Sequence, residues 1–557
     1  MNQALLSAAR APALQKLEEN ILQGRATAVT GLTESMAAFV ASRVVSDTGR
    51  RALLITANDL KANRLADDAQ QLLPDQAACL PGGEIDMTRG ASSHESAWRR
   101  LETLSRITTG DTRLLVTSMD AALQRMGDAD AFRAATVRLM VADRYPPEQL
   151  IRALTLMGYE RVDMVEGKGQ CALRGSILDV YPPAATQSLR IEFFDDEVDS
   201  IRAFDCISQR SLERVKVALI PPAAEVLLPE SERAEAARRM REAVNASAPG
   251  QDVSDRLFDD LPPLPDDDDE LAEVFDKKIA PKAREKAADA ARAAELERRA
   301  AALLRDADAV ENGLPFRRIR AWLTVLTDHT ATVLDWFRPD VVFLCAPDQL
   351  RDRADERLRG FGEDLSSAME RGEAVLTQQT LLMDWGQLLA AMEGTPVMTL
   401  SELLRGQGGV KTEDAIDLGC KGVAGYQSQL KLLAEDCRAW RKQGWCVALL
   451  SGGVARGKRL TQSLTELDSP ATFMEDAHNL IIGETVVLPG TLSHGFLWPE
   501  AKLAVVADTD IYGAGYRKAR SRRTAGEKIA AFTDLKVGDY VVHEDHGVGV
   551  YQGTVHL

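Results

Sequence analysis

The sequence predicts a multidomain α/β protein with a small β-rich insertion, a second α/β unit and the start of a small β-barrel. Three observations predict this class. The chain of 557 residues is too long for one hydrophobic core. Strand-like and helix-like runs alternate within residues 51–126, whereas residues 171–204 and 537–553 show only short β-rich runs broken by glycine, proline or aspartate.

The first α/β unit, residues 1–136, is predicted from two strand-helix pairs. Residues 51–56 form a strand candidate that leads into the helical run 59–73, and strand 113–117 leads into helix 119–126. Between them, residues 92–107 have helical spacing, with Ser92 or Ser93 as the N-cap. Alternation of strands and helices implies a parallel sheet.

Residues 171–204 predict an antiparallel meander. Two β-rich arms flank Pro182-Pro183, and a tight reversal falls at Asp195-Asp196. Because successive strand residues face opposite sides, the apolar residues of the arm 189–194 form a core face, and Arg190 and Phe194 lie on the other face.

Arg174, in the preceding arm, is expected close to these two residues. An aromatic side chain between two arginines on a wet strand is the composition of a binding hot spot. The alternative is an isolated exposed phenylalanine with surface ion pairs.

The runs Arg174–Pro182 and Arg190–Arg202 resemble domain 2 of the bacterial transcription-repair coupling factors, a domain shared with the excision-repair helicase UvrB. The resemblance implies that this domain docks on the damage-recognition ATPase UvrA. By position, Arg174, Arg190 and Phe194 match the residues that make this contact in the family. The first unit is then a degenerate UvrB-like helicase domain.

The junction after the strand at residues 28–30 is where the UvrB-like fold carries its nucleotide loop. A working loop needs several glycines, a lysine for the phosphates and a serine or threonine for magnesium. Here Gly31 is followed by Glu34 and Met36 in place of glycines, and Ala37-Ala38 stand where the lysine and hydroxyl residue belong. We expect an inactive site without ATP.

Two further segments bear on nucleotide chemistry. Strand 341–344 is followed by Cys345-Ala346 rather than by an acidic magnesium pair. Gly452–Lys458 matches the G-x-x-x-x-G-K pattern between a strand and a helix, but the next residue, Arg459, lacks the hydroxyl. A plain turn with Arg456 and Lys458 exposed is the preferred interpretation. Residues 81–91 also lack the aromatic hairpin with which UvrB probes DNA.

Residues 223–400 are expected to return to the first sheet with added helical material, including the acidic run 266–270 and a charged helix within 281–305. Residues 420–512 predict a second α/β unit. Its expected elements are helices 427–443 and 456–467 and strands 445–450, 480–482 and 503–508.

The last segment has short β runs at 537–543 and 547–553, the start of a barrel. It resembles the RNA-polymerase-interacting domain of the coupling factors and the CarD-type regulators, and Leu557 matches a residue implicated in the polymerase contact. His543 and His546 are expected to be turn residues rather than metal ligands.

Bulk properties narrow the function classes. The formal charge of -17 opposes DNA binding by the segment as a whole, and the basic run 516–523 is expected to be a solvated linker. Seven scattered cysteines indicate reduced thiols and no zinc site. Without a signal peptide or a membrane-spanning run, a cytoplasmic location is expected.

The combined prediction is the N-terminal segment of a coupling factor that recruits UvrA to RNA polymerase stalled at DNA lesions. The resemblance implies contact with the polymerase β subunit, contact with damaged DNA through the full-length protein, and ATP and magnesium only in a translocase motor beyond this segment. The alternatives are a UvrB-type helicase subunit and a CarD-like polymerase-binding regulator. Expected domains are 1–136 (1a), 137–222 (2), 223–419 (1b), 420–512 (3), a basic linker 513–530 and the polymerase-interacting domain 531–557.

Overall fold

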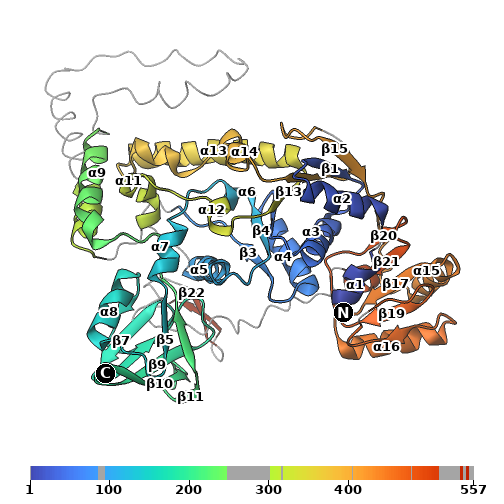
Figure 1. Ribbon diagram of the computed structural model, residues 1–557, viewed down its shortest axis with the longest axis horizontal. Coiled ribbons are helices and arrows are strands. Elements are labelled where there is room, and N and C mark those ends of the chain that lie inside the picture. The colour runs from blue at the N-terminus through green and yellow to red at the C-terminus, as the bar shows by residue number, and fades with distance from the viewer. Residues whose placement is uncertain are drawn as a thin grey trace, which may run out of the picture.

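The computed structural model of the chain describes residues 2–9, 11–85, 94–246, 301–314, 318–403, 406–477, 479–513, 540–543 and 547–550. This part of the chain contains one sheet of seven strands, two sheets of six strands and two two-stranded ribbons. Figure 1 shows the seven-stranded sheet in the centre, the first six-stranded sheet below it and the second six-stranded sheet at the right.

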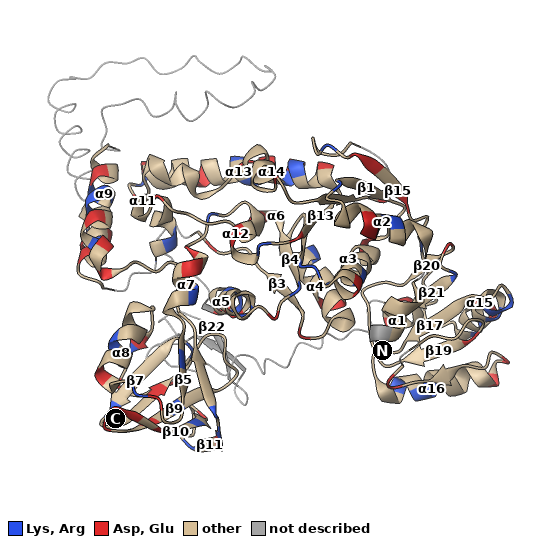
Figure 2. Ribbon diagram, in the orientation of Figure 1, with Lys and Arg blue, Asp and Glu red and all other residues tan. Residues whose placement is uncertain are grey.

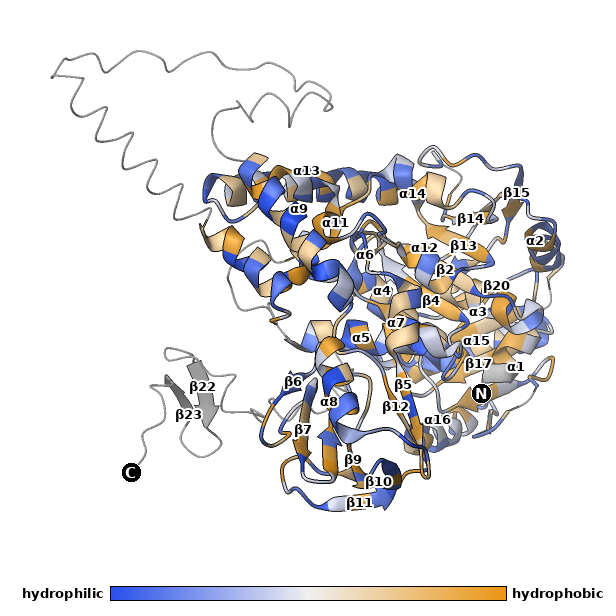
Figure 3. Cartoon of the chain, turned by 60° about the vertical axis from the view of Figure 1, so that its left-hand side comes forward, coloured by the Kyte–Doolittle hydropathy of each residue, from blue (hydrophilic) through white to orange (hydrophobic). Residues whose placement is uncertain are grey.

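The first sheet is entirely parallel, with the order β15-β1-β14-β13-β2-β4-β3. Strands β13 and β14 lie between β1 and β2, which confirms that residues after 223 return to the first sheet. The central strands β2 and β13 are buried and almost wholly apolar, as their colour in Figure 3 shows, because helices pack on both faces of the sheet. The strands are β1 Thr27–Thr30, β2 Ala52–Thr56, β3 Ala77–Leu80, β4 Leu114–Ser118, β13 Val341–Cys345, β14 Val397–Leu400 and β15 Asp414–Asp417.

Alternate residues of these strands feed two cores. Leu54 packs with α1–α4 on one face, and Leu53 packs with α5, α6, α7 and α12–α14 on the other. The helices are α1 Asn2–Ala8, α2 Pro12–Leu22, α3 Glu34–Thr48, α4 Asp59–Leu72, α5 His94–Thr109, α6 Met119–Ala122, α7 Ala129–Ala135, α12 Val333–Phe337, α13 Pro347–Glu370 and α14 Trp385–Ala391.

The predicted helix 119–126 is too long. Helix α6 ends at Ala122 because the following residues pair as extended backbone: Gln124 forms a β-bridge with Leu382, and Met126 forms one with Ala331. The predicted helix 59–73 is confirmed by α4, whose first turn is capped by the Asn58 side chain accepting from the Lys61 N–H.

The second sheet has the order β11-β10-β9-β8-β7-β6, antiparallel except between β6 and β7. The predicted meander is therefore confirmed. Its two tight reversals use left-handed backbone at Gly175 (φ 60°) and Asp195 (φ 58°). The elements are α8 Pro147–Leu156, β6 Glu160–Arg161, β7 Gln170–Arg174, β8 Ile177–Val180, β9 Ser188–Phe194, β10 Glu197–Phe204 and β11 Ser211–Arg214.

A two-stranded antiparallel ribbon joins the first and second sheets. Strand β5 (Val137–Met140) leads into the second sheet, and β12 (Val217–Ile220) leads out of it. The register places Val137 directly opposite Ile220. The chain therefore enters and leaves this domain at one place.

A helical group packs beside the first sheet around the buried Trp322. Acidic and basic residues alternate along α9 (Figure 2), where Arg238 pairs with Glu235 at 2.6 Å. The acidic run 266–270 lies outside the described residues. The elements are η1 Glu230–Glu232, α9 Arg233–Ala246, a helical stretch at 301–311, η2 Ile319–Trp322, α11 Leu323–Leu326 and η3 Leu376–Leu381.

A buried ion pair fixes this helical group to the first sheet. Arg100 on α5 donates from Nε and Nη2 to the Glu225 carboxylate at 2.7 and 3.1 Å, and Arg320 approaches the same group at 3.6 Å. The side chains of Arg100 and Glu225 are both buried. Removing one partner would leave the other charge without compensation in the interior.

The third sheet has the order β16-β20-β21-β17-β19-β18. The predicted strand 480–482 is wrong: Ile482 is 75% exposed, and the strands that pair here are β18 and β19. Helix α15 begins later than the predicted 427, since Gln427 and Ser428 have positive φ. The elements are β16 Lys421–Gly422, α15 Leu430–Lys442, β17 Cys446–Leu450, α16 Val454–Glu466, β18 Thr472–Phe473, β19 Thr485–Leu488, β20 Phe496–Trp498, β21 Leu503–Val506 and α17 Asp508–Tyr512.

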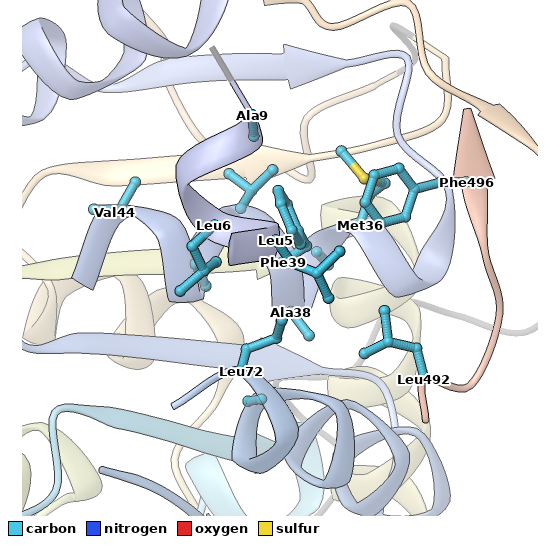
Figure 4. Packing of buried hydrophobic residues seen from close by; sticks show 14 of the residues in the cluster. Leu5, Leu6, Ala9, Met36, Ala38, Phe39, Val44, Leu72, Leu492 and Phe496 are labelled. Carbon is cyan, nitrogen blue, oxygen red and sulfur yellow. The ribbon is translucent and has the colours of Figure 1, made fainter. Parts of the chain in front are cut away.

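The third sheet packs against the helices that cover one face of the first sheet. Phe39 of α3 meets Phe496 of β20 with ring centroids 5.0 Å apart, and Leu5 of α1 lies beside them (Figure 4). The buried Asp68 of α4 accepts from the backbone N–H and the hydroxyl group of Ser493. A mixed apolar and polar contact thus joins the third sheet to the helical layer of the first.

Near the end of the chain, β22 (Tyr540–His543) and β23 (Gly547–Val550) pair antiparallel. They fall within the two predicted β runs, and the barrel itself stays a prediction. Among the described residues, no helix has the length and apolar composition needed to cross a membrane.

Candidate functional site

The second sheet has one face buried against α8 and an opposite face, which we call the open face, where charged side chains lie beside a small buried cluster of Val165, Ala172 and Phe204. Leu189, Ile191 and Phe193 of β9 pack against α8, as their alternation predicts. Arg190 and Glu192 lie on the opposite face, where the cross-strand register places Asp179 of β8 and Arg202 of β10 beside Arg190. The open face therefore gathers charged residues from several strands.

Phe194 ends β9 and is 81% exposed. The hairpin that carries it is held by the segment before α8: the Ala142 N–H donates to the Val198 carbonyl at 2.8 Å, and the Tyr145 N–H donates to the Asp196 carbonyl at 2.7 Å. A large aromatic side chain on a fixed hairpin exposes apolar area to water without local disorder, which is typical of a preformed contact surface.

Asp179 joins the two predicted arginines. Its Oδ1 accepts from Arg190 Nε at 2.7 Å, and its Oδ2 accepts from Arg190 Nη2 at 2.9 Å and from Arg174 Nη2 at 2.6 Å. The Asp179 side chain is 1% exposed because the two guanidinium groups cover it. Arg174 and Arg190 thus meet, as the sequence predicts, but through a carboxylate.

The two arginines differ in exposure. Arg190 is 14% exposed; it also donates to the Gln209 carbonyl at 3.2 Å and side chain at 3.3 Å, and it lies 4.6 Å from the Phe204 ring centroid. Hydrogen bonding to Asp179 raises the pKa of Arg190. Arg174 is 47% exposed. Of the three predicted contact residues, Phe194 and Arg174 are therefore the accessible ones.

Sequence reasoning missed Asp179, Phe204 and Gln209. Asp179 could have been found, because it interrupts the apolar residues of β8 at the position whose side chain faces Arg190. The contribution of Gln209 depends on the conformation of the 205–210 loop, where Gln209 has a φ of 57°. That conformation has no local sequence signal.

The backbone and side chains of neighbouring segments occupy the space around Gly31 in the predicted nucleotide loop. The Gly31 N–H donates to the Glu402 carbonyl at 3.1 Å, and a side chain at Gly31 would lie 2.2 Å from Asp417 Oδ1. Two carboxylates, those of Glu34 and Asp417, thus lie at the junction. Met36, Ala37 and Ala38 are buried.

This arrangement is unfavourable for phosphate. An amide that already donates to a carbonyl is not available to an anion, and nearby carboxylates repel one. Cys345, at the end of β13, is half-buried, and its removal from water raises the pKa of its thiol to about 12, with a further contribution from Glu34. The absence of ATP binding stays a prediction, and this geometry supports it.

The G-x-x-x-x-G-K segment forms a strand-to-helix turn. The Gly452 N–H donates to the Gly490 carbonyl at 2.9 Å, and Asp508 lies beside this glycine. Arg456 and Lys458 are exposed, as the turn interpretation predicts. A carboxylate beside the turn is unfavourable for a phosphate group.

Other candidates lie outside the described residues. These are Leu557, the basic run 516–523 and most of the polymerase-interacting segment. Within the ranges that the structure covers, no group of three or more histidine, cysteine, aspartate or glutamate side chains could hold a metal ion.

Comparison with known proteins gives two family matches. Residues 137–225 match the model of the UvrB interaction domain, which contains the whole open face described above. Residues 535–557 match the model of the CarD-like/TRCF RID domain.

Full-chain relatives agree with these matches. The chain is 26% identical over 531 residues to the transcription-repair-coupling factor of Bacillus subtilis (strain 168), covering 94% of this chain and 42% of the relative. It is 24% identical over 534 residues to that of Staphylococcus aureus (strain bovine RF122 / ET3-1), covering 95% and 42%. The chain therefore spans about two-fifths of the length of the curated relatives it matches.

Proposed function

We propose that this chain, which is similar over nearly its whole length to the N-terminal part of transcription-repair-coupling factors, brings UvrA to RNA polymerase stalled at DNA lesions. The UvrA contact is made by the open face of the second sheet. The observation that carries this proposal is Phe194: a phenylalanine that is 81% exposed lies on the same sheet face as the half-exposed Arg174, within residues that match the UvrB interaction domain.

The chemistry of this face suits a protein partner with an apolar pocket and an acidic rim. Aromatic and arginine side chains dominate the binding energy of protein interfaces. Arg174 offers a guanidinium that can bind a carboxylate on the partner with two parallel hydrogen bonds. The fixed hairpin lowers the entropy cost of presenting Phe194.

The polymerase contact is proposed for the last segment of the chain. Residues 535–557 match the CarD-like/TRCF RID model, and β22 and β23 supply an antiparallel pair within it. We assign the β subunit of RNA polymerase as the partner and Leu557 as a contact residue. One chain would thus hold the polymerase at one end and UvrA at another, in the bacterial cytoplasm where both act.

ATP, magnesium and contact with damaged DNA are proposed only for the full-length protein. The relatives are more than twice as long as this chain, and the expected translocase motor belongs to the part that the chain does not span. For the first sheet, the occupied junction at Gly31 argues against the UvrB-type helicase alternative.

Surface-immobilised UvrA and the purified full chain test the proposal. Wild-type chain should bind in a saturable way, purified UvrB should compete for the same site, and Arg190→Ala/Phe194→Ala should bind at least 30-fold more weakly. Ile482→Ala, which removes a similarly exposed apolar side chain from the loop before β19, should bind like wild type. Equal binding by the wild type and the double variant would exclude the open face as the contact.

RNA polymerase binding by the same variants separates the alternatives. A CarD-like regulator without a repair role would bind polymerase and show no affinity for UvrA. On our proposal both partners bind, and the double variant loses only UvrA.

A further inference from the structure

A buried carboxylate lies beneath the proposed contact surface. Asp179 is on the open face of the sheet, yet its side chain is 1% exposed. Both oxygens accept hydrogen bonds from arginines on the neighbouring strands β7 and β9. A carboxylate that is withdrawn from water needs charged hydrogen-bond partners, and these bonds also restrict the orientation of the two arginines.

Arg190 is directed into the protein. Four hydrogen bonds link its guanidinium to Asp179 and Gln209, and a guanidinium has five N–H groups to donate. One side of the guanidinium faces the Phe204 ring at 4.6 Å. With 14% of the side chain exposed, Arg190 has little surface left for a second protein.

Arg174 has the opposite arrangement. Its Nη2 donates to Asp179 at 2.6 Å, which is its single hydrogen bond to the described residues, and 47% of the side chain is exposed. Most of its N–H groups therefore face solvent. The one bond to Asp179 restricts how the guanidinium can rotate.

We propose that Asp179 is a positioning residue for the UvrA contact: it holds Arg190 inward as a brace and orients Arg174 outward, toward a carboxylate on the partner next to the pocket that takes Phe194. The inference rests on the function proposed above. It assigns separate roles to the two arginines: Arg174 touches the partner, and Arg190 acts through Asp179. A preoriented Arg174 loses less side-chain freedom on binding than a free one.

A coupling experiment with UvrA tests this assignment. Asp179→Asn keeps the size of the side chain and removes its charge, and we expect about a 10-fold loss of affinity for UvrA. Arg174→Ala should lose at least as much. Because Asp179 acts through Arg174, adding Asp179→Asn to Arg174→Ala should weaken binding by less than 2-fold further.

A purely structural role predicts a different pattern. If Asp179 only supported the fold, the affinity losses of Asp179→Asn and Arg174→Ala would multiply in the double variant. The losses of Asp179→Asn and the distant Phe194→Ala should multiply on either hypothesis. Glu192→Gln is the matched control, because this carboxylate lies on the same face and contacts Ser200 and Arg202. It should change the affinity by less than 2-fold.

A second variant covers the case in which Asp179→Asn does not fold. Gln209→Ala releases the outer side of Arg190 and leaves the carboxylate paired. It should reduce affinity about 3-fold, and this effect should vanish when Arg190→Ala is present.

The outcomes separate the two proposals. Binding by wild type establishes the proposed function by itself. The positioning role is overturned if folded Asp179→Asn binds UvrA like wild type. It is also overturned if Asp179→Asn causes its full loss of affinity when Arg174→Ala is already present. Both outcomes leave the proposed function intact. No binding by wild type removes both.

Discussion

Phe194→Ala isolates the exposed aromatic group from the ion pairs around it. The side chain is 81% exposed and lies at the end of β9, so truncation removes almost no packing from the folded chain. We expect the free energy of unfolding to change by less than about 0.5 kcal/mol, as for other surface substitutions. Any effect on binding then reports the contact itself.

The binding free energy that Phe194→Ala removes can be estimated from the exposed area of the side chain. A phenylalanine side chain buries about 200 Å², and 81% of that leaves ~160 Å² for a partner to cover. At about 25 cal/mol per Å², full burial contributes up to ~4 kcal/mol. Hot-spot truncations cost about 2 kcal/mol or more, so the affinity for UvrA should fall by roughly 30-fold to several hundred-fold.

Biolayer interferometry with immobilised UvrA measures this loss, with thermal melting of the same samples as the check on folding. Ile482→Ala is the control, because this residue is 75% exposed but lies in the loop before β19, outside the second sheet. If Phe194→Ala binds within 3-fold of wild type, the exposed ring is not a contact, and the hot-spot reasoning is refuted.

Three further predictions concern stability and nucleotide binding. Burial, together with the nearby Asp47 carboxylate, raises the pKa of Glu18 from 4.5 to about 7. The folded chain therefore keeps a proton that the unfolded chain releases, and the free energy of unfolding should fall as pH rises from about 4.5 to 7. Urea titrations should show that Glu18→Gln reduces this dependence on pH. Restoring the loop residues with Ala37→Lys/Ala38→Thr should lower the melting temperature and give no binding of a fluorescent ATP analogue, because both positions are buried. Glu225→Gln should cost about 3–5 kcal/mol in urea unfolding, because it leaves a buried arginine unpaired.

Each of these has a control. Glu19→Gln, at an exposed neighbour of Glu18, should leave the pH slope unchanged; a wild-type slope in Glu18→Gln would contradict the assignment. ATP bound by the wild type or by the loop variant would show that the junction at Gly31 is open. Glu230→Gln removes one member of an exposed ion pair with Arg152 and should lower the free energy of unfolding by less than about 1 kcal/mol. If Glu225→Gln lowered it by no more than this, the buried-pair argument would be contradicted.

The sequence predicts the local structure of the site well. The alternation of β9 identifies its core face, and Phe194 is exposed because it falls on the other face at a hairpin end. These features depend on period-two spacing and on the turn residues Asp195-Asp196, which are readable within one segment. The prediction that Arg174 approaches Arg190 is also confirmed.

Features that depend on pairing between distant segments were not predictable in this way. The apolar run at Leu480–Ile482 has strand composition but lies in a loop, whereas Thr485–Leu488 pairs with β17 and β18. The packing of Phe496 on Phe39 joins residues more than four hundred positions apart. The inward orientation of Arg190 needs Asp179, Phe204 and Gln209 together, and they come from two strands and a loop.

The ribbon formed by β5 and β12 has a consequence for how this domain can be used. Since Val137 and Ile220 face each other across neighbouring strands, the ends of the inserted segment are only about 5 Å apart. A segment with adjacent ends can be cut out and grafted into a surface loop of an unrelated host without stretching either chain. The same geometry allows such a module to pass between proteins in evolution while its docking face stays intact.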